Sequence, residues 1–164
     1  MNRTFGPDLD EQCFDYPFPP DGLDPQEDAL QGLQAQERPP QVGTLIVQGT
    51  WAAEAARTMF PHLAVIGCRH SAGDPETWAP LAGRRDLVLW PSLDQAGKIF
   101  AQAVHRGLEA LGNPLHLVEV PPGWPAGWNL GRRPPEGISP DDLLGMIEGA
   151  REWGGQLVAG GLKA

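Results

Sequence analysis

Short apolar runs alternate with helix-like segments from residue 44 onward. The runs are too short for helices and are rich in branched aliphatic residues, so they predict β-strands. The predicted strands are residues 44–47, 62–67, 86–90 and 115–120. Strands that are apolar throughout are typical of a mostly parallel sheet covered on both faces. The pattern therefore predicts a three-layer, Rossmann-like α/β domain with about four strands flanked by helices.

Helices are predicted between these strands and after the last one. The predicted segments are residues 51–60, 75–82, 94–111 and about 140–153. The third has apolar residues at helical spacing and ends before Gly112, a residue typical of C-terminal caps. The fourth begins with Ser139, Pro140 and two acids, which is typical of a helix N-terminus. Residues 121–140, rich in Pro, Gly and Trp, predict a loop.

Residues 1–41 differ from the rest in composition and charge. They hold nine acids and two bases, a net charge of −7 out of the −9 carried by all 164 residues. An acidic segment rich in Pro and Gln buries too little apolar surface to order itself, so we expect a disordered arm before a domain over residues 42–164. Phe14, Tyr16 and Phe18 lie among its acids and form a candidate docking site for a basic partner surface. The alternative is a solvating tail with incidental aromatic residues.

The composition also bears on location and partners. No window approaches the roughly 20 consecutive apolar residues of a membrane span, and no secretory or transit signal is recognisable, so we expect a cytoplasmic protein without a membrane partner. Cys13 and Cys68 are isolated and lack the spacing of a zinc site or disulfide framework. The net acidity disfavours nucleic acid as a partner, because nucleic-acid-binding domains normally carry a basic stripe.

Two segments that follow predicted strands carry a recognisable pattern. The first strand ends in Val47-Gln48-Gly49-Thr50, before an Ala-rich helix. Trp78, Pro80-Leu81-Ala82-Gly83-Arg84, a strand and Trp90-Pro91-Ser92-Leu93-Asp94-Gln95-Ala96-Gly97 come next, and Gly127-Trp128-Asn129 comes later. Over residues 44–130 this order resembles the Toprim domains of phage and plasmid primase-helicases. Those domains have Val-Glu-Gly-Glu, Trp-Pro-Asp-x-Asp-x-x-Gly and Gly-Trp-Asp at the corresponding places.

The resemblance implies a magnesium-dependent phosphodiester chemistry whose acids are mostly missing here. In Toprim enzymes a glutamate after the first strand acts as general acid or base and holds Mg²⁺ together with two aspartates. The corresponding positions are Gln48, Thr50, Ser92, Asp94 and Asn129. Thr50 stands in place of the catalytic glutamate and Ser92 in place of the first aspartate, so only Asp94 is charged. Mg²⁺ requires hard oxygen ligands with charge, and threonine has no proton that titrates near neutral pH. We therefore expect no enzyme activity and no cofactor. Asp94 is a weak metal candidate and more simply a helix N-cap.

The favoured function is a catalytically inactive Toprim-like module of a phage, plasmid or other mobile element that binds a protein partner. A narrower hypothesis is inhibition of a host nucleic-acid-processing or defence complex, of the anti-CRISPR type, with the acidic surface imitating a phosphate backbone.

Two alternatives remain open. One is a Mg²⁺-dependent primase- or nuclease-type enzyme, in which Asp74 or Glu76 helps Asp94 to rebuild a metal site. The other is a replication accessory that binds single strands on aromatic and basic side chains of the loop. The candidate residues for that surface are Trp124, Trp128, Arg132 and Arg133. The two tryptophans can equally pack the loop onto the sheet.

Overall fold

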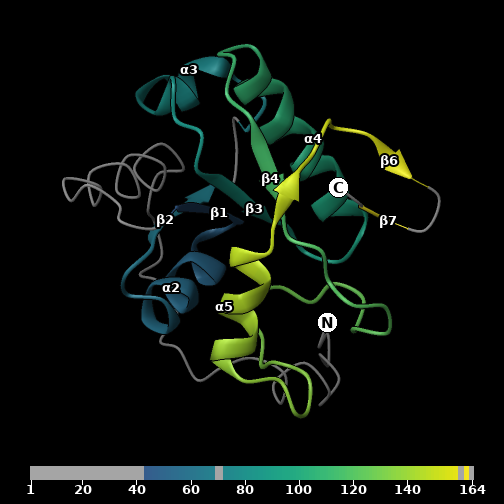
Figure 1. The fold of residues 1–164 in the computed structure, drawn as a ribbon. Helices are drawn as coiled ribbons and strands as arrows, with labels where there is room; N and C mark the ends of the chain where they lie inside the picture. Colours follow the sequence, from purple (N-terminus) through teal and green to yellow (C-terminus); the bar gives the residue numbers. More distant parts are fainter. Residues whose placement is uncertain (1–42, 69–71, 159–160, 163–164) are drawn as a thin grey trace, which may run out of the picture.

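Parallel strands alternate with helices along the chain, as the apolar runs predict. The computed structural model describes residues 43–68, 72–158 and 161–162. The strands of its main sheet are β1 (Thr44–Gln48), β2 (Ala64–Cys68), β3 (Leu87–Trp90), β4 (Leu115–Leu117) and β5 (Arg151–Glu152). Their order across the sheet is β2-β1-β3-β4-β5, with the first four parallel and β5 antiparallel to β4 (Figure 1). The prediction of a mostly parallel α/β sheet, consistent with a Rossmann-like fold, is confirmed.

Helices cover both faces of this sheet. They are α2 (Thr50–Met59), α3 (Pro75–Trp78), α4 (Gln95–Glu109) and α5 (Pro140–Glu148), with a 3-10 turn, η1 (Ala79–Leu81), directly after α3. One face carries α3 and α4, and the opposite face carries α2 and α5 (Figure 1). The three layers expected from the apolar strands are therefore present.

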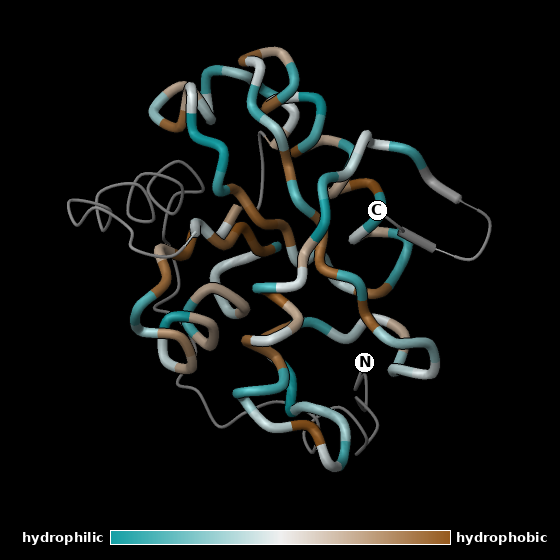
Figure 2. The backbone as a smooth tube through the Cα atoms, in the orientation of Figure 1, coloured by the Kyte–Doolittle hydropathy of each residue, from teal (hydrophilic) through white to brown (hydrophobic). Residues whose placement is uncertain are grey.

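The strands supply a hydrophobic core on each face because successive side chains point in opposite directions. In β1, Ile46 packs with the α3 and α4 residues, whereas Leu45 and Val47 pack with those of α2 and α5. The most hydrophobic stretches of backbone run through the central strands between the helical layers (Figure 2). Burial on both faces explains why these strands are apolar at every position rather than at alternate ones.

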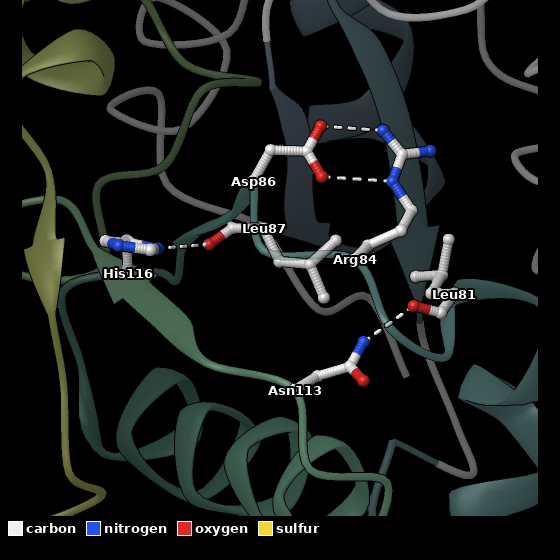
Figure 3. Close-up of polar contacts among 6 residues, drawn as sticks. All are labelled: Leu81, Arg84, Asp86, Leu87, Asn113 and His116. Carbon is white, nitrogen blue, oxygen red and sulfur yellow. Dashed lines mark hydrogen bonds and ion pairs between the residues drawn. The ribbon is translucent and has the colours of Figure 1, made fainter.

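The connection from α4 to β4 is fixed by Gly112 and Asn113. Gly112 has a φ of +72°, and its N–H donates to the Glu109 carbonyl at 2.9 Å while the Asn113 N–H donates to Leu108 at 3.0 Å. These bonds close the helix, as the sequence predicts for Gly112. The buried Asn113 side chain also donates to the Leu81 carbonyl at 2.6 Å (Figure 3). It accepts from the Gly83 N–H at 3.1 Å, and the two bonds tie the η1 turn to the connection before β4.

Polar contacts also fasten the amino-terminal ends of β3 and β4. Arg84 donates to both carboxylate oxygens of Asp86, at 3.0 Å and 2.7 Å, and these bonds lower the pKa of Asp86 from its ordinary value of 3.8 (Figure 3). His116 donates from Nδ1 to the Leu87 carbonyl at 3.2 Å (Figure 3). These bonds hold the end of the sheet opposite to the candidate site.

Two predicted elements were too long. The helix expected to reach residue 153 ends at Glu148, and Arg151 and Glu152 form β5 on the edge of β4. Trp153 is buried in the core on the α4 face, and its backbone N–H donates to the Leu115 carbonyl at 2.8 Å. The chain must leave the helix before residue 153 for these contacts to form. The strand expected over residues 115–120 ends at Leu117. Past β5, β6 (Leu157–Val158) and β7 (Gly161–Leu162) form a separate antiparallel pair.

The predicted acidic arm at residues 1–41, with Phe14, Tyr16 and Phe18, lies outside the described residues. Within the described part of the chain, no helix combines the length and hydropathy needed to cross a membrane.

Candidate functional site

The strand order places the carboxyl ends of β1 and β3 side by side at a topological switch point. From β1 the chain crosses to β2 on one side, whereas β3 and β4 lie on the other side. α2 follows β1 on one face of the sheet and α4 follows β3 on the opposite face. Ligands of open α/β sheets bind in the crevice at such a point, so the residues just past β1 and β3 form the candidate site.

Gln48, Ser92 and Asp94 meet there through the Ser92 hydroxyl. Ser92 Oγ lies 2.9 Å from Gln48 Oε1 and 2.8 Å from Asp94 Oδ1, and Ser92 is buried. A hydroxyl has a single proton, and the Asp94 carboxylate can only accept, so Ser92 donates to Asp94. Both contacts are satisfied when the Gln48 amide turns its NH₂ group toward the Ser92 oxygen. The result is a chain of hydrogen bonds that ends on the carboxylate.

Asp94 is also the N-cap of α4. Its Oδ1 accepts from the Gly97 N–H at 2.7 Å, and its backbone is extended, as an N-cap requires. The interpretation of Asp94 as a helix cap is confirmed. Its other oxygen, Oδ2, accepts no hydrogen bond from any residue that the structure describes, and a Cβ placed on Gly127 would lie 3.4 Å from it.

Two glycines shape this corner of the fold. Gly49 turns the chain from β1 into α2 with a φ of +84°, a backbone conformation that side chains disfavour. Gly97 lies against the backbone of Ser92, where a Cβ would stand 1.9 Å from the Ser92 carbonyl oxygen. The close approach of α4 to the end of β3 therefore depends on glycine at position 97.

The remaining two positions of the pattern are Thr50 and Asn129. Thr50 is the first residue of α2 and is half-buried. Asn129 turns its amide oxygen toward its own loop, where it accepts from the Gly131 N–H at 2.9 Å. Trp51 Nε1 donates to the Gly131 carbonyl at 3.0 Å and so fastens this loop to α2.

Trp128 holds the loop against the carboxyl end of β3. The Trp128 carbonyl accepts from the Leu93 N–H at 2.9 Å, and Trp128 Nε1 donates to the Arg133 carbonyl at 2.9 Å. Its ring is buried, 5.7 Å from Trp90 and 4.7 Å from Trp124 between centroids. Trp128 therefore packs the loop onto the sheet, and its faces are not open for stacking with a base.

The other residues of the candidate single-strand surface are only partly accessible. Trp124 and Arg132 are half-buried, and Arg133 is exposed. With Trp128 covered, Trp124 is the one ring of this candidate surface that is partly exposed, which is a small platform for single-strand binding.

A pocket of about 260 Å³ opens beside the network, between the carboxyl ends of β3 and β4. Ser92, Asp94 and Lys98 provide its polar wall, and residues of the segment that follows β4, from Val118 to Trp124, provide most of its apolar wall. Lys98 is not among the site residues predicted from the sequence. Its position one helical turn after Asp94 was the available signal, because side chains four residues apart share one face of a helix.

The acids proposed to rebuild a metal site are separate from Asp94. Asp74 caps α3, accepting from the Glu76 N–H at 3.0 Å, and both side chains are exposed. Among the residues described, no three His, Cys, Asp or Glu side chains come close enough together to hold a metal ion.

Comparisons with protein-family models, with curated proteins and with solved structures found no match to this chain. A function must therefore be inferred from the geometry of its own residues.

Proposed function

We propose that this chain is a degenerate Toprim-like domain that acts by binding a protein partner rather than by phosphodiester chemistry. The observation that carries the proposal is the set of hydrogen bonds made by Asp94. Asp94 is the only charged residue among the positions that correspond to the Toprim acids. Its Oδ1 caps α4 and accepts from Ser92, and the neutral Gln48 completes the network.

This arrangement opposes metal catalysis on chemical grounds. Mg²⁺ in phosphoryl-transfer sites is typically held by one or two carboxylates together with water and substrate phosphate. Here the neighbours of Asp94 are a hydroxyl and a backbone N–H that donate to the carboxylate oxygen. Donors occupy the place from which a cation would approach Oδ1, and none of Gln48, Thr50 and Ser92 can act as a general base near neutral pH.

The assignment to the Toprim group is supported by where the matching residues fall. Gln48 and Ser92 come from separate segments of the pattern, yet they end two neighbouring strands and touch. A Toprim site likewise requires its acids after the first and third strands to share one metal. The match in sequence order therefore has a counterpart in space.

The partner that we propose is a protein with a basic surface, such as a nucleic-acid-processing complex of the host of a phage or other mobile element. The formal charge of −9 favours association with a basic surface by long-range attraction. A nucleic-acid channel is such a surface, and an acidic protein bound in it would exclude the nucleic acid.

Divalent metal is expected to leave the stability of the protein unchanged. With one carboxylate at the site, about 10 mM Mg²⁺ should raise the melting temperature by less than ~1 °C, because a ligand present below its Kd stabilises little. Differential scanning fluorimetry with Mg²⁺ and Mn²⁺ measures this directly. The matched variant is Asp94→Asn, which keeps an N-cap oxygen and removes the charge. A rise of several degrees that Asp94→Asn abolishes would refute the inactive assignment.

Partner capture tests the second half of the proposal. The full chain, immobilised and exposed to host extract, is expected to retain a nucleic-acid-processing complex, and added duplex DNA should compete it away because both ligands use one basic channel. A captured complex that still binds DNA normally, or capture of no such complex, would contradict the proposed mode of action.

A further inference from the structure

The pocket beside Asp94 carries two opposite charges that do not pair with each other. Asp94 and Lys98 both line it, one helical turn apart on α4. No ion pair joins them, and Lys98 makes no side-chain hydrogen bond or ion pair with any residue in the described ranges. Asp94 Oδ2 is equally without a hydrogen-bond donor from those residues. Two oppositely charged side chains therefore line one cavity without an ion pair between them.

The rest of the wall is apolar. It is formed by Pro91, Val118, Val120, Pro121, Pro122 and Trp124, with Leu93 near the polar side. Val118 and Trp124 belong to the same hydrophobic cluster as Trp128, so this wall is backed by the core on the α2 and α5 face. A cavity that combines an apolar wall with a few convergent polar groups is typical of small-molecule sites.

We infer that this pocket binds a small zwitterion with an apolar body, of the size and chemistry of a free α-amino acid such as leucine. The ligand's ammonium group pairs with Asp94 Oδ2, its carboxylate pairs with Lys98, and its side chain lies against Val118, Val120 and Trp124. Both of the charged residues that this ligand requires, Asp94 and Lys98, line the pocket.

Size and charge disfavour other small ligands. A volume of about 260 Å³ lies at the lower end of the range for ligand pockets, roughly 300–1,000 Å³, so a nucleotide would not be enclosed. A free phosphate would meet the Asp94 carboxylate as well as Lys98, and like charges at short range repel. A simple cation bound to Asp94 would place a second positive charge in the pocket that Lys98 also lines, and the two charges would repel each other. A ligand with both charges satisfies both groups.

Isothermal titration calorimetry with L-leucine and its charge-deleted derivatives tests the inference on the intact chain. L-leucine is expected to bind at submillimolar to millimolar concentration. Leucinamide lacks the carboxylate, N-acetyl-leucine lacks the ammonium charge, and N-acetyl-leucinamide lacks both. Each loss should weaken binding about tenfold, since charge-assisted hydrogen bonds exceed neutral ones by about this factor.

Two variants assign the charges to residues. Asp94→Asn should bind leucine about tenfold more weakly and should no longer distinguish it from N-acetyl-leucine, while Lys98→Gln should no longer distinguish it from leucinamide. Arg106→Gln, which removes a charge from an exposed residue near the end of the same helix, is the matched control and should bind normally. Absence of binding by leucine and by other apolar amino acids up to about 10 mM would overturn the inference. So would equal binding of leucine and N-acetyl-leucinamide, an outcome that needs no variant.

Discussion

Replacement of Gly97 by alanine is expected to lower the free energy of unfolding by ~3 kcal/mol or more, because the added methyl group has no space. Its Cβ would lie 1.9 Å from the Ser92 carbonyl oxygen and 2.7 Å from Ser92 Oγ. A backbone carbonyl cannot rotate away as a flexible side chain can. α4 would have to withdraw from β3, which would break the 2.7 Å bond from the Gly97 N–H to Asp94. Urea unfolding followed by circular dichroism measures the loss.

Gly145 provides the matched control for this substitution. It lies within α5, is exposed, and a Cβ there would meet no atom within 4 Å. Gly145→Ala should therefore stabilise the protein by roughly 0.5–1 kcal/mol, as expected for an unhindered helical glycine. Equal effects of the two substitutions would show that α4 does not approach Ser92 as closely as described.

The requirement at Gly97 bears on what the resemblance to Toprim domains can mean. Gly97 is needed for close approach, Gly49 for a left-handed turn, and Trp128 for holding the loop on the sheet. These residues serve the shape of the fold whether or not a metal is bound. Their presence therefore reflects the shape of the fold and does not argue for activity. Activity depends on charge at the strand ends, where Gln48 and Ser92 are neutral.

Local patterns predicted most of the fold. The four parallel strands and the helices between them follow from apolar runs and helical spacing, which are properties of short segments. The end of α5 was predicted wrongly because its cause is tertiary. Trp153 gains burial beside α4, and its N–H bonds to Leu115, so Arg151 and Glu152 pair with β4. Nothing within residues 148–153 alone indicates the presence of that edge.

The candidate site could be predicted in position and not in detail. Residues that follow adjacent parallel strands must lie at one edge of the sheet, so the proximity of Gln48 and Ser92 follows once β1 and β3 are neighbours. The direct contact of their side chains depends on rotamers, which sequence spacing does not specify. The pocket depends on the path of the loop after β4, and irregular loops rich in proline and glycine have no period from which to predict a path.

The double variant Gln48→Glu with Ser92→Asp is expected to create a divalent-metal site. The Ser92 Oγ atom lies 2.9 Å from Gln48 Oε1 and 2.8 Å from Asp94 Oδ1. The two substitutions would therefore gather three carboxylates around one point. Without metal, their repulsion should lower stability and raise the carboxyl pKa values. Millimolar Mg²⁺ or Mn²⁺ should then raise the melting temperature by several degrees, because binding to the folded state alone stabilises it.

Controls separate this outcome from a general effect of added charge. The single variants supply two carboxylates each and should bind metal more weakly than the double variant, since affinity for hard cations rises with ligand charge. Adding Asp94→Asn to the double variant should remove the gain while keeping the cap of α4. Ser92 is one of the residues that line the adjoining pocket, so a larger side chain at position 92 would have a cavity beside it. A folded double variant with no metal-dependent stabilisation would show that the ends of β1 and β3 lack the geometry of a Toprim metal site. In that case the resemblance would extend to the scaffold alone.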